Sequence, residues 1–271
     1  MKKTGLFFKK FYLGIILFFL YIPIFVLIVF SFNETKSRSV FSGFTLDWYI
    51  RLFNNRIIIS SLLNTIIIAC VSSIVSTVLG TFAAIGINSM RKVPKRVVMG
   101  ITNMPIINPE IVTGVSLMLL FVFFAARMNL EFGFVTLLIA HITFNVPYVI
   151  LNVMPKFNQM DPHIYEAAQD LGCSPFQAFR KVVLPEIMPG VISGFLMSFT
   201  YSLDDFVISY FTSGSTSQTL PITIYSMTRR KISPEINALS TLIFLVVVIV
   251  LIVKNIIETR AAKKNGTYKG A

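Results

Sequence analysis

Apolar and polar positions of this chain alternate in long blocks. Six apolar blocks are each about 20 residues long and almost free of charge, which is the length that an α-helix needs to cross a bilayer core about 30 Å thick. The pattern predicts an all-α integral membrane protein with six transmembrane helices, over residues 11–32, 62–87, 106–126, 134–154, 191–212 and 236–257.

The first block could be mistaken for a secretory signal, because lysines precede its apolar core. The core is too long for a signal peptide, and no small-residue cleavage site follows it. We therefore expect an uncleaved first helix, with an extracytoplasmic loop, over residues 1–61. A transmembrane domain over residues 62–257 and a cytoplasmic tail over 258–271 complete the predicted organisation.

Composition excludes a soluble globular enzyme. Hydrophobic residues make up 55% of the chain and charged residues 13%, whereas soluble domains average about 25% charged. The net charge of +12 arises from lysines and arginines between the apolar blocks, which fits a membrane protein rather than a nucleic-acid binder. With the N-terminus inside, 16 of the 24 basic residues are cytoplasmic, so both termini are predicted to be cytoplasmic.

Small residues and cysteines add two narrower predictions. The pairs Gly190/Gly194 and Gly80/Ala84 have the four-residue spacing that lets membrane helices pack closely. Cys70 and Cys173 lie far apart in different settings, so neither a disulfide framework nor a metal cluster is expected.

The polar segment over residues 155–190 predicts two short helices on the cytoplasmic side. For the first, Asp161 is the expected N-cap, Pro162 the first helical residue and Gly172 the stop. Its apolar face comprises Ile164, Tyr165, Ala168 and Leu171.

For the second short helix, Ser174 and Gln177 form a capping box around Pro175. Pro185 is expected to end this helix. Its apolar face comprises Phe176, Phe179, Val182 and Val183. An amphipathic pair lying on the membrane surface is one interpretation of the two helices.

A more specific pattern runs through the same segment. It reads Glu166-Ala167-Ala168, three residues, Gly172, nine residues, then Val182-Val183-Leu184-Pro185. This resembles the EAA signature of ABC-importer permeases, with Val182 where isoleucine is usual. The resemblance implies the MetI-like permease fold and a segment that docks on a cytoplasmic ATPase through Glu166, Ala167, Ala168, Gly172, Leu184 and Pro185.

No catalytic constellation accompanies this segment. The phosphate-binding pattern GxxxxGK[ST] is absent, and the two histidines, His141 and His163, have no nucleophile pattern around them. We expect a transport subunit without a cofactor, ATP and Mg²⁺ being bound by a partner ATPase. His141 is expected to be a hydrogen-bonded helix-packing residue, with a smaller chance of a functional role.

Acidic residues within the apolar blocks mark the expected substrate path, because charges in the bilayer are costly. These are Glu110, Asp204 and Asp205. On the fifth block, Asp205 shares one helical stripe with four other polar residues, which predicts contact with water or a pore; the other members are Ser198, Ser202, Ser209 and Thr212. Asp204 is expected to face a neighbouring helix or a partner chain. With Tyr201 nearby, the acids suit an organic cation or, equally, an ion pair with a partner.

Further motifs resemble spermidine/putrescine permeases of the PotC type. They include Tyr21-Ile22-Pro23, the run over residues 141–144, Ser202–Ser209, and the run over residues 233–239. The resemblance implies a bacterial inner-membrane importer with a homologous second permease, an ATPase dimer and an extracytoplasmic polyamine-binding protein. Alternatives are a related permease for iron(III) or sulfate, an ion-coupled secondary transporter using Glu110 or Asp205, and a purely structural subunit.

Overall fold

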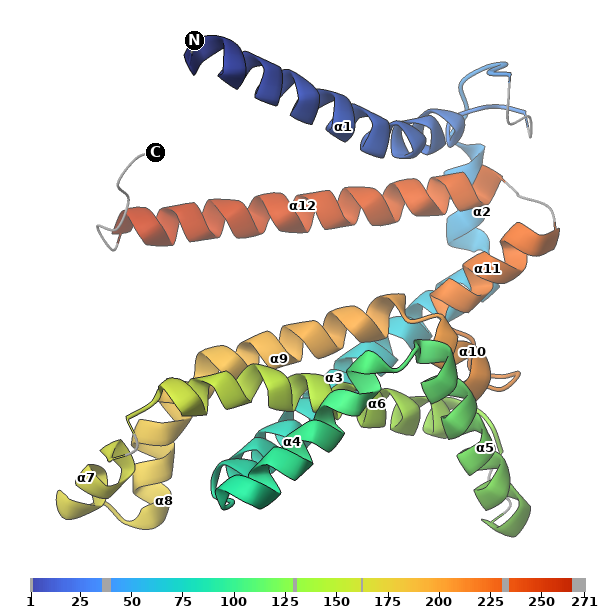
Figure 1. Ribbon diagram of the computed structural model, residues 1–271. Coiled ribbons are helices and arrows are strands. Elements are labelled where there is room, and N and C mark those ends of the chain that lie inside the picture. The colour runs from blue at the N-terminus through green and yellow to red at the C-terminus, as the bar shows by residue number, and fades with distance from the viewer. Residues whose placement is uncertain (1, 36–39, 129–130, 162, 231–233, 265–271) are drawn as a thin grey trace. The chain divides into compact units, whose positions relative to one another are not determined.

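The computed structural model describes residues 2–35, 40–128, 131–161, 163–230 and 234–264. In these residues the chain is helical, with one isolated bridge between Asn33 and Phe44 (Figure 1), and the expected all-α class is confirmed. The helices are α1 (Lys2–Phe30), α2 (Asp47–Asn54), α3 (Arg56–Asn88), α4 (Lys92–Ile107), α5 (Glu110–Met128), α6 (Phe134–Gln159), α7 (Ile164–Asp170), α8 (Pro175–Ala178), the π-helical turn η1 (Phe179–Val183), α9 (Leu184–Asp204), α10 (Val207–Thr212), α11 (Leu220–Arg230) and α12 (Pro234–Lys264).

Among the described residues, five helical runs are long and apolar enough to cross a membrane. They cover Phe11–Phe30, Arg56–Asn88, Glu110–Arg127, Phe134–Gln159 and Pro175–Asp204, and they correspond to the first five expected spans. The sixth expected span lies on α12, whose described residues include the apolar helical stretch Pro234–Val246. The count of six therefore stays a prediction.

The third span begins later than residue 106. Helix α4 continues to Ile107, and Asn108 leaves the helical conformation with φ −72° and ψ 140°. The cause is Pro109, because a proline disfavours the helical region for the residue before it. Helix α5 then starts at Glu110, which places this carboxylate at a helix start.

The prediction that Pro185 ends a short helix is wrong. The chain passes from α8 through η1 into α9 without leaving helical geometry. A proline in a regular α-helix clashes with the carbonyl four residues earlier, and the wider π turn just ahead of Pro185 provides room for its ring. The fifth span is consequently one helical run that starts at Pro175.

The chain divides into two compact units, Met1–Ile58 with Ile224–Ala271, and Ile59–Thr223. In the first unit, α12 packs against both α1 and α2. The loop between α1 and α2 is held by the Trp48 indole, whose Nε1 donates to the Asn33 carbonyl at 2.7 Å.

The second unit is built on close packing of α6 and α9, which run side by side (Figure 1). A Cβ atom added to Gly190 would lie 2.8 Å from the Asn152 carbonyl oxygen, and one added to Gly194 would lie 3.2 Å from the Val149 Cα. On α3, a Cβ added to Gly80 would come within 2.6 Å of the Val149 Cβ. The small-residue pairs therefore pack as predicted, and Val149 lies between two glycines.

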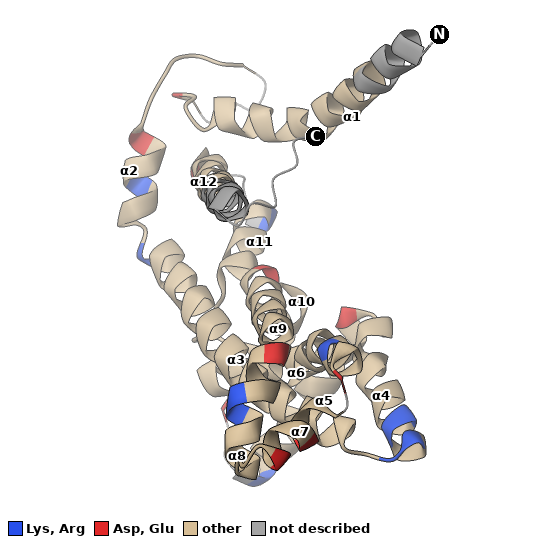
Figure 2. Cartoon of the chain, turned by 90° about the vertical axis from the view of Figure 1, so that its left-hand side faces the viewer, with Lys and Arg blue, Asp and Glu red and all other residues tan. Residues whose placement is uncertain are grey.

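Two apolar clusters occupy different stretches of α6. The first surrounds Val153 and Phe157 and includes residues of α3, η1 and α9, with α4 and Tyr165 of α7 packed against it. The second surrounds Ala140 and Phe144 and includes residues of α5 and α10. Basic residues at the start of α4 and around α8 lie at the same end of this unit (Figure 2). Helices α7 and η1 and the acidic residues near α10 are thus held by separate cores.

Replacing Gly80 with alanine is expected to destabilise the protein by about 1–3 kcal/mol, because the new methyl group would overlap Val149 in a packed interface. Gly86 of the same helix is a matched control, since nothing lies within 4 Å of a Cβ added there. Gly86→Ala should be neutral or stabilising. Thermal unfolding of the detergent-solubilised protein measures both variants, and equal melting temperatures would contradict the packing argument.

Candidate functional site

Helix α9 ends at Asp204, and the chain turns before α10 begins at Val207. Asp205 has φ −61° and ψ 119°, which is extended backbone. Its carboxylate accepts hydrogen bonds from the amides of Ile208, at 3.2 Å, and Ser209, at 2.7 Å. Asp205 therefore caps α10 and satisfies amides that have no partner within the helix.

Helix α6 supports this break from the other side. His141 Nε2 lies 3.0 Å from Ser209 Oγ and 3.6 Å from Asp205 Oδ2. Thr136 donates to the Thr212 carbonyl at 2.8 Å. His141 is buried, which confirms its predicted role as a hydrogen-bonded packing residue and makes it a support for the Asp205 cap.

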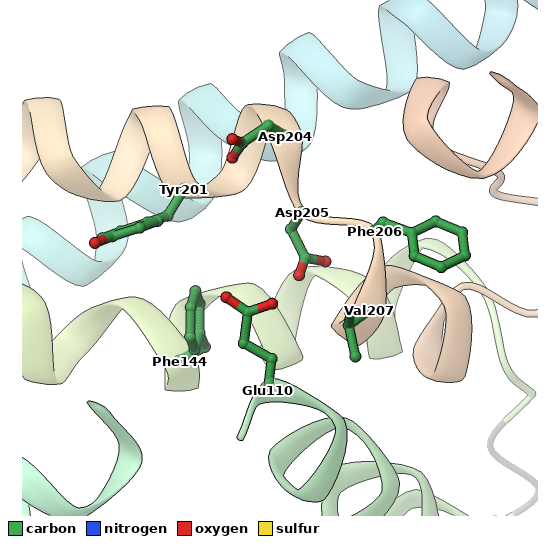
Figure 3. Close-up of a pocket in the computed structure, with 7 residues that line it drawn as sticks. All are labelled: Glu110, Phe144, Tyr201, Asp204, Asp205, Phe206 and Val207. Carbon is green, nitrogen blue, oxygen red and sulfur yellow. The ribbon is translucent and has the colours of Figure 1, made fainter. Parts of the chain in front are cut away.

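A pocket opens at the break. Three carboxylates line it together with apolar and aromatic side chains, and the lining residues are Glu110, Phe144, Tyr201, Asp204, Asp205, Phe206 and Val207. Glu110 and Asp205 point toward one another across it, from α5 and from the turn (Figure 3). No lysine or arginine is among these lining residues, so the pocket attracts cations.

Aromatic rings extend from one side of the pocket. The rings of Tyr148 and Tyr201 are 4.5 Å apart between centroids, and those of Phe144 and Tyr148 are 5.1 Å apart. Sequence reasoning found Tyr201 but missed Phe144 and Tyr148 as neighbours of the acids. The spacing of His141, Phe144 and Tyr148 along one helix face was the available indication.

The continuous polar stripe expected on the fifth span is not formed as predicted. The helix breaks after Asp204, and the members Ser198, Ser202, Asp205, Ser209 and Thr212 are buried between helices. Asp205 is only 8% exposed, whereas Asp204 is exposed at the pocket. The relative accessibility of the two acids is thus the reverse of the expectation, because the break turns the second acid inward.

Ser202, which belongs to the stripe expected to face water or a pore, does not line the pocket. Its hydroxyl lies 3.0 Å from Ser72 Oγ and accepts from Asn145 Nδ2 at 2.8 Å. It therefore joins α9 to α3 and α6 within the protein.

Residues 171–177, in the segment predicted to be cytoplasmic, have the turn chemistry that their sequence predicts. Gly172 has φ +88°, and its amide donates to the Gln169 carbonyl while the Cys173 amide donates to the Ala168 carbonyl. These two bonds define a Schellman motif, which favours glycine at its left-handed position. The prediction that Asp161 is the N-cap of the first short helix is wrong, because α7 begins at Ile164 with His163 at its N-cap position. Asp161 Oδ1 instead accepts a hydrogen bond from the His163 amide in the preceding turn, and Pro162 lies outside the described residues.

The second turn is confirmed as a capping box. Ser174 Oγ accepts from the Gln177 amide at 3.3 Å, and Gln177 Oε1 accepts from the Ser174 amide at 3.1 Å. Two residues expected on the apolar faces instead point outward, since Leu171 is 87% exposed and Phe176 is 70% exposed. The segment therefore presents apolar side chains at its tip.

Around this tip, the residues of the EAA-like pattern have different environments. Glu166, Ala167, Gly172 and Pro185 are exposed, Leu184 is half-buried and Ala168 is buried. Ala168 packs inward because the helix is attached to the rest of the unit through this face. Glu166 is accessible and lies 3.4 Å from His163.

The sequence model of the binding-protein-dependent transport system inner membrane components matches residues 76–263. The chain belongs to this family. Its members are inner-membrane transport components, so the chain is a multi-pass transport subunit and not an enzyme.

Several curated proteins are similar over nearly the whole length of this importer permease. The spermidine/putrescine transport system permease protein PotC of Haemophilus influenzae is 37% identical over 254 residues, which is 94% of this chain and 97% of that protein. The putrescine transport system permease protein PotI of Escherichia coli K12 is 38% identical over 251 residues, which is 91% of this chain and 89% of that protein.

Solved importers share the fold of this permease. A chain of a bacterial ABC transporter that imports the acidic polysaccharide alginate has a TM-score of 0.70 at 15% identity, covering 95% of this chain and 96% of that one. A chain of the MetNI methionine ABC transporter has a TM-score of 0.61 at 16% identity, covering 80% of this chain and 98% of that one. The MetI-like permease fold is therefore confirmed.

The Asp205 cap predicts a stability effect that separates the two neighbouring aspartates. Asp205→Ala removes both acceptors from α10 and is expected to cost about 1–2 kcal/mol, while Asp205→Asn retains one acceptor and should cost less. Asp204→Ala is the control, because that side chain is exposed. Melting temperatures of the purified importer test the order, and equal losses at positions 204 and 205 would contradict the capping role.

Proposed function

We propose that this permease forms half of the translocation path of an ATP-driven polyamine importer and that the acidic pocket contacts the cargo. The observation that carries the proposal is the group of three carboxylates, Glu110, Asp204 and Asp205, beside packed aromatic rings. The names of the PotC and PotI relatives support spermidine or putrescine as the cargo.

The carboxylates and rings suit the chemistry of an alkyl ammonium ion. Three like charges in one pocket repel each other, and an ammonium group between them lowers that repulsion. The faces of Tyr201 and Phe144 attract a cation by about 0.5–2 kcal/mol each, depending on desolvation, and they also offer apolar contact to the methylene chain. We assign direct contact to Glu110 and Asp204, which are exposed, and a positioning role to Asp205.

Residues 164–185, called the coupling segment here, are the proposed docking site for the ATPase. Exposed Leu171 and Phe176 supply apolar contacts, and Glu166 offers a carboxylate to a basic partner. ATP and Mg²⁺ belong to an ATPase dimer in this proposal, and a homologous second permease and an extracytoplasmic binding protein complete the importer. The count of basic residues supports both cytoplasmic termini and a cytoplasmic coupling segment.

The other cargoes and mechanisms fit less well. Sulfate would favour basic side chains in the pocket, and iron(III) has no support from the names of the similar permeases. An ion-coupled transporter would not need the EAA-like coupling segment, and a structural subunit would not need the acidic pocket.

The cargo assignment predicts that Asp204→Asn and Glu110→Gln each lower the maximal rate of polyamine uptake by about tenfold, since a close charge pair contributes about 1.5 kcal/mol or more. Half-saturating concentrations should change little, because the binding protein captures the polyamine first. Uptake of radiolabelled putrescine into proteoliposomes holding the complete importer measures both quantities.

Glu131→Gln is the matched control, since this acid is exposed and does not line the pocket. Putrescine uptake by the Glu131→Gln importer should equal that of the unmodified importer. Full uptake by both pocket variants would exclude contact between these acids and the cargo.

The docking assignment predicts that Gly172→Val uncouples the permease from its ATPase. A β-branched residue at φ +88° is strained by about 1–2 kcal/mol, so the Schellman turn should open. Gly172→Asn is the control, because asparagine tolerates the left-handed region. Co-purification of the ATPase subunit should fall for valine and persist for asparagine. Undiminished association and uptake for valine would remove this turn from the coupling mechanism.

A further inference from the structure

Helix α2 directly precedes a candidate membrane span. It has eight residues, Asp47–Asn54, and is about 12 Å long, far too short to span a bilayer. One residue, Asn55, separates it from α3, which is a candidate membrane span starting at Arg56. The apolar sequence of that span begins directly after Arg56, with Ile57 and Ile58.

The rotation of α2 about its own axis is fixed by its contacts. Trp48 and Leu52 are 5% and 2% exposed, respectively, and α2 packs against α12. The Tyr49 hydroxyl lies 2.7 Å from Ser31 Oγ. Together with the Trp48 bond to the Asn33 carbonyl, these contacts determine which side chains point away from the protein.

The outward side of α2 has an apolar part and a polar part. Ile50 is 59% exposed and Phe53 is 64% exposed. At 100° per residue they lie 60° apart on the helix. Asp47 and Arg51 occupy the neighbouring polar part and are exposed as well. A short helix with this division, next to a membrane span, is typical of helices that lie in the bilayer interface.

We propose that α2 is an interfacial anchor whose Ile50 and Phe53 side chains insert among phospholipid acyl chains. Two observations favour lipid over a protein partner. Exposed Ile57 follows four residues after Phe53, at the start of the adjoining candidate span, and Arg51 and Arg56 lie in the same stretch with positive charges that suit lipid phosphates. The anchor would hold the loop between α1 and α3 at the membrane surface. This inference depends on the membrane location of the chain and not on its cargo.

The test uses the complete importer in nanodiscs of phosphatidylcholine and phosphatidylglycerol. In a chain with Cys70→Ala and Cys173→Ser, and with partners freed of reactive cysteines, Phe53→Cys carries a polarity-sensitive fluorophore. Asp47→Cys is the matched control on the polar part. Lipid with a nitroxide near the headgroup end of the acyl chain should quench the label at position 53 severalfold more than the label at 47, and aqueous iodide should show the opposite order.

Three outcomes would overturn the anchor. Equal lipid quenching at both positions would remove the facial preference, and stronger iodide quenching at 53 would place that face in water. A label at 53 shielded from both quenchers would show that another subunit covers it. Ile50→Cys repeats the measurement in case Phe53→Cys disturbs folding, and retained uptake by the labelled importer verifies that the assembly is intact.

Discussion

A helix can break inside a membrane protein only where its freed backbone groups find partners, because lipid offers none. At the end of α9 that requirement is met by one carboxylate, since Asp205 accepts from two amides of α10. The pocket depends on this cap. With the break in place, Asp204 stays at the surface while Asp205 turns inward toward His141. The Asp205 cap, which gives two backbone amides of α10 their hydrogen-bond partner, therefore also brings the carboxylates of the acidic pocket together.

Helix α9 links the proposed coupling segment to the acidic pocket. Its 21 residues span about 30 Å, with the coupling segment at one end and the acidic pocket at the other. The two ends pack in different apolar clusters, and close contact with α6 joins them. Ser202 of α9 contacts Ser72 of α3 and accepts a hydrogen bond from Asn145 of α6, so that α3 is attached to the α6–α9 pair. Because the connection between the ends is helical throughout, a displacement at one end is transmitted to the other through a stiff element.

Sequence reasoning succeeded where the determining chemistry is local. Hydropathy located the spans, and the turns at Gly172 and Ser174 follow from neighbouring residues alone. It failed at the break after Asp204, because no proline or glycine marks it and the cap is completed by tertiary contacts. The continuation of the helix through Pro185 was also not predicted, since a π turn has no simple sequence pattern. The ring of Phe144 lines the pocket from another helix, so periodicity along the fifth span could not reveal it.

The position of Val149 between Gly80 and Gly194 constrains how this protein can change over evolutionary time. Three helices share one fixed volume at that point, and no side chain there can grow unless another shrinks. A larger residue at position 80 becomes acceptable only in a lineage where position 149 has already become smaller. These residues, which touch neither cargo nor ATPase in the proposed mechanism, should therefore vary together across related permeases.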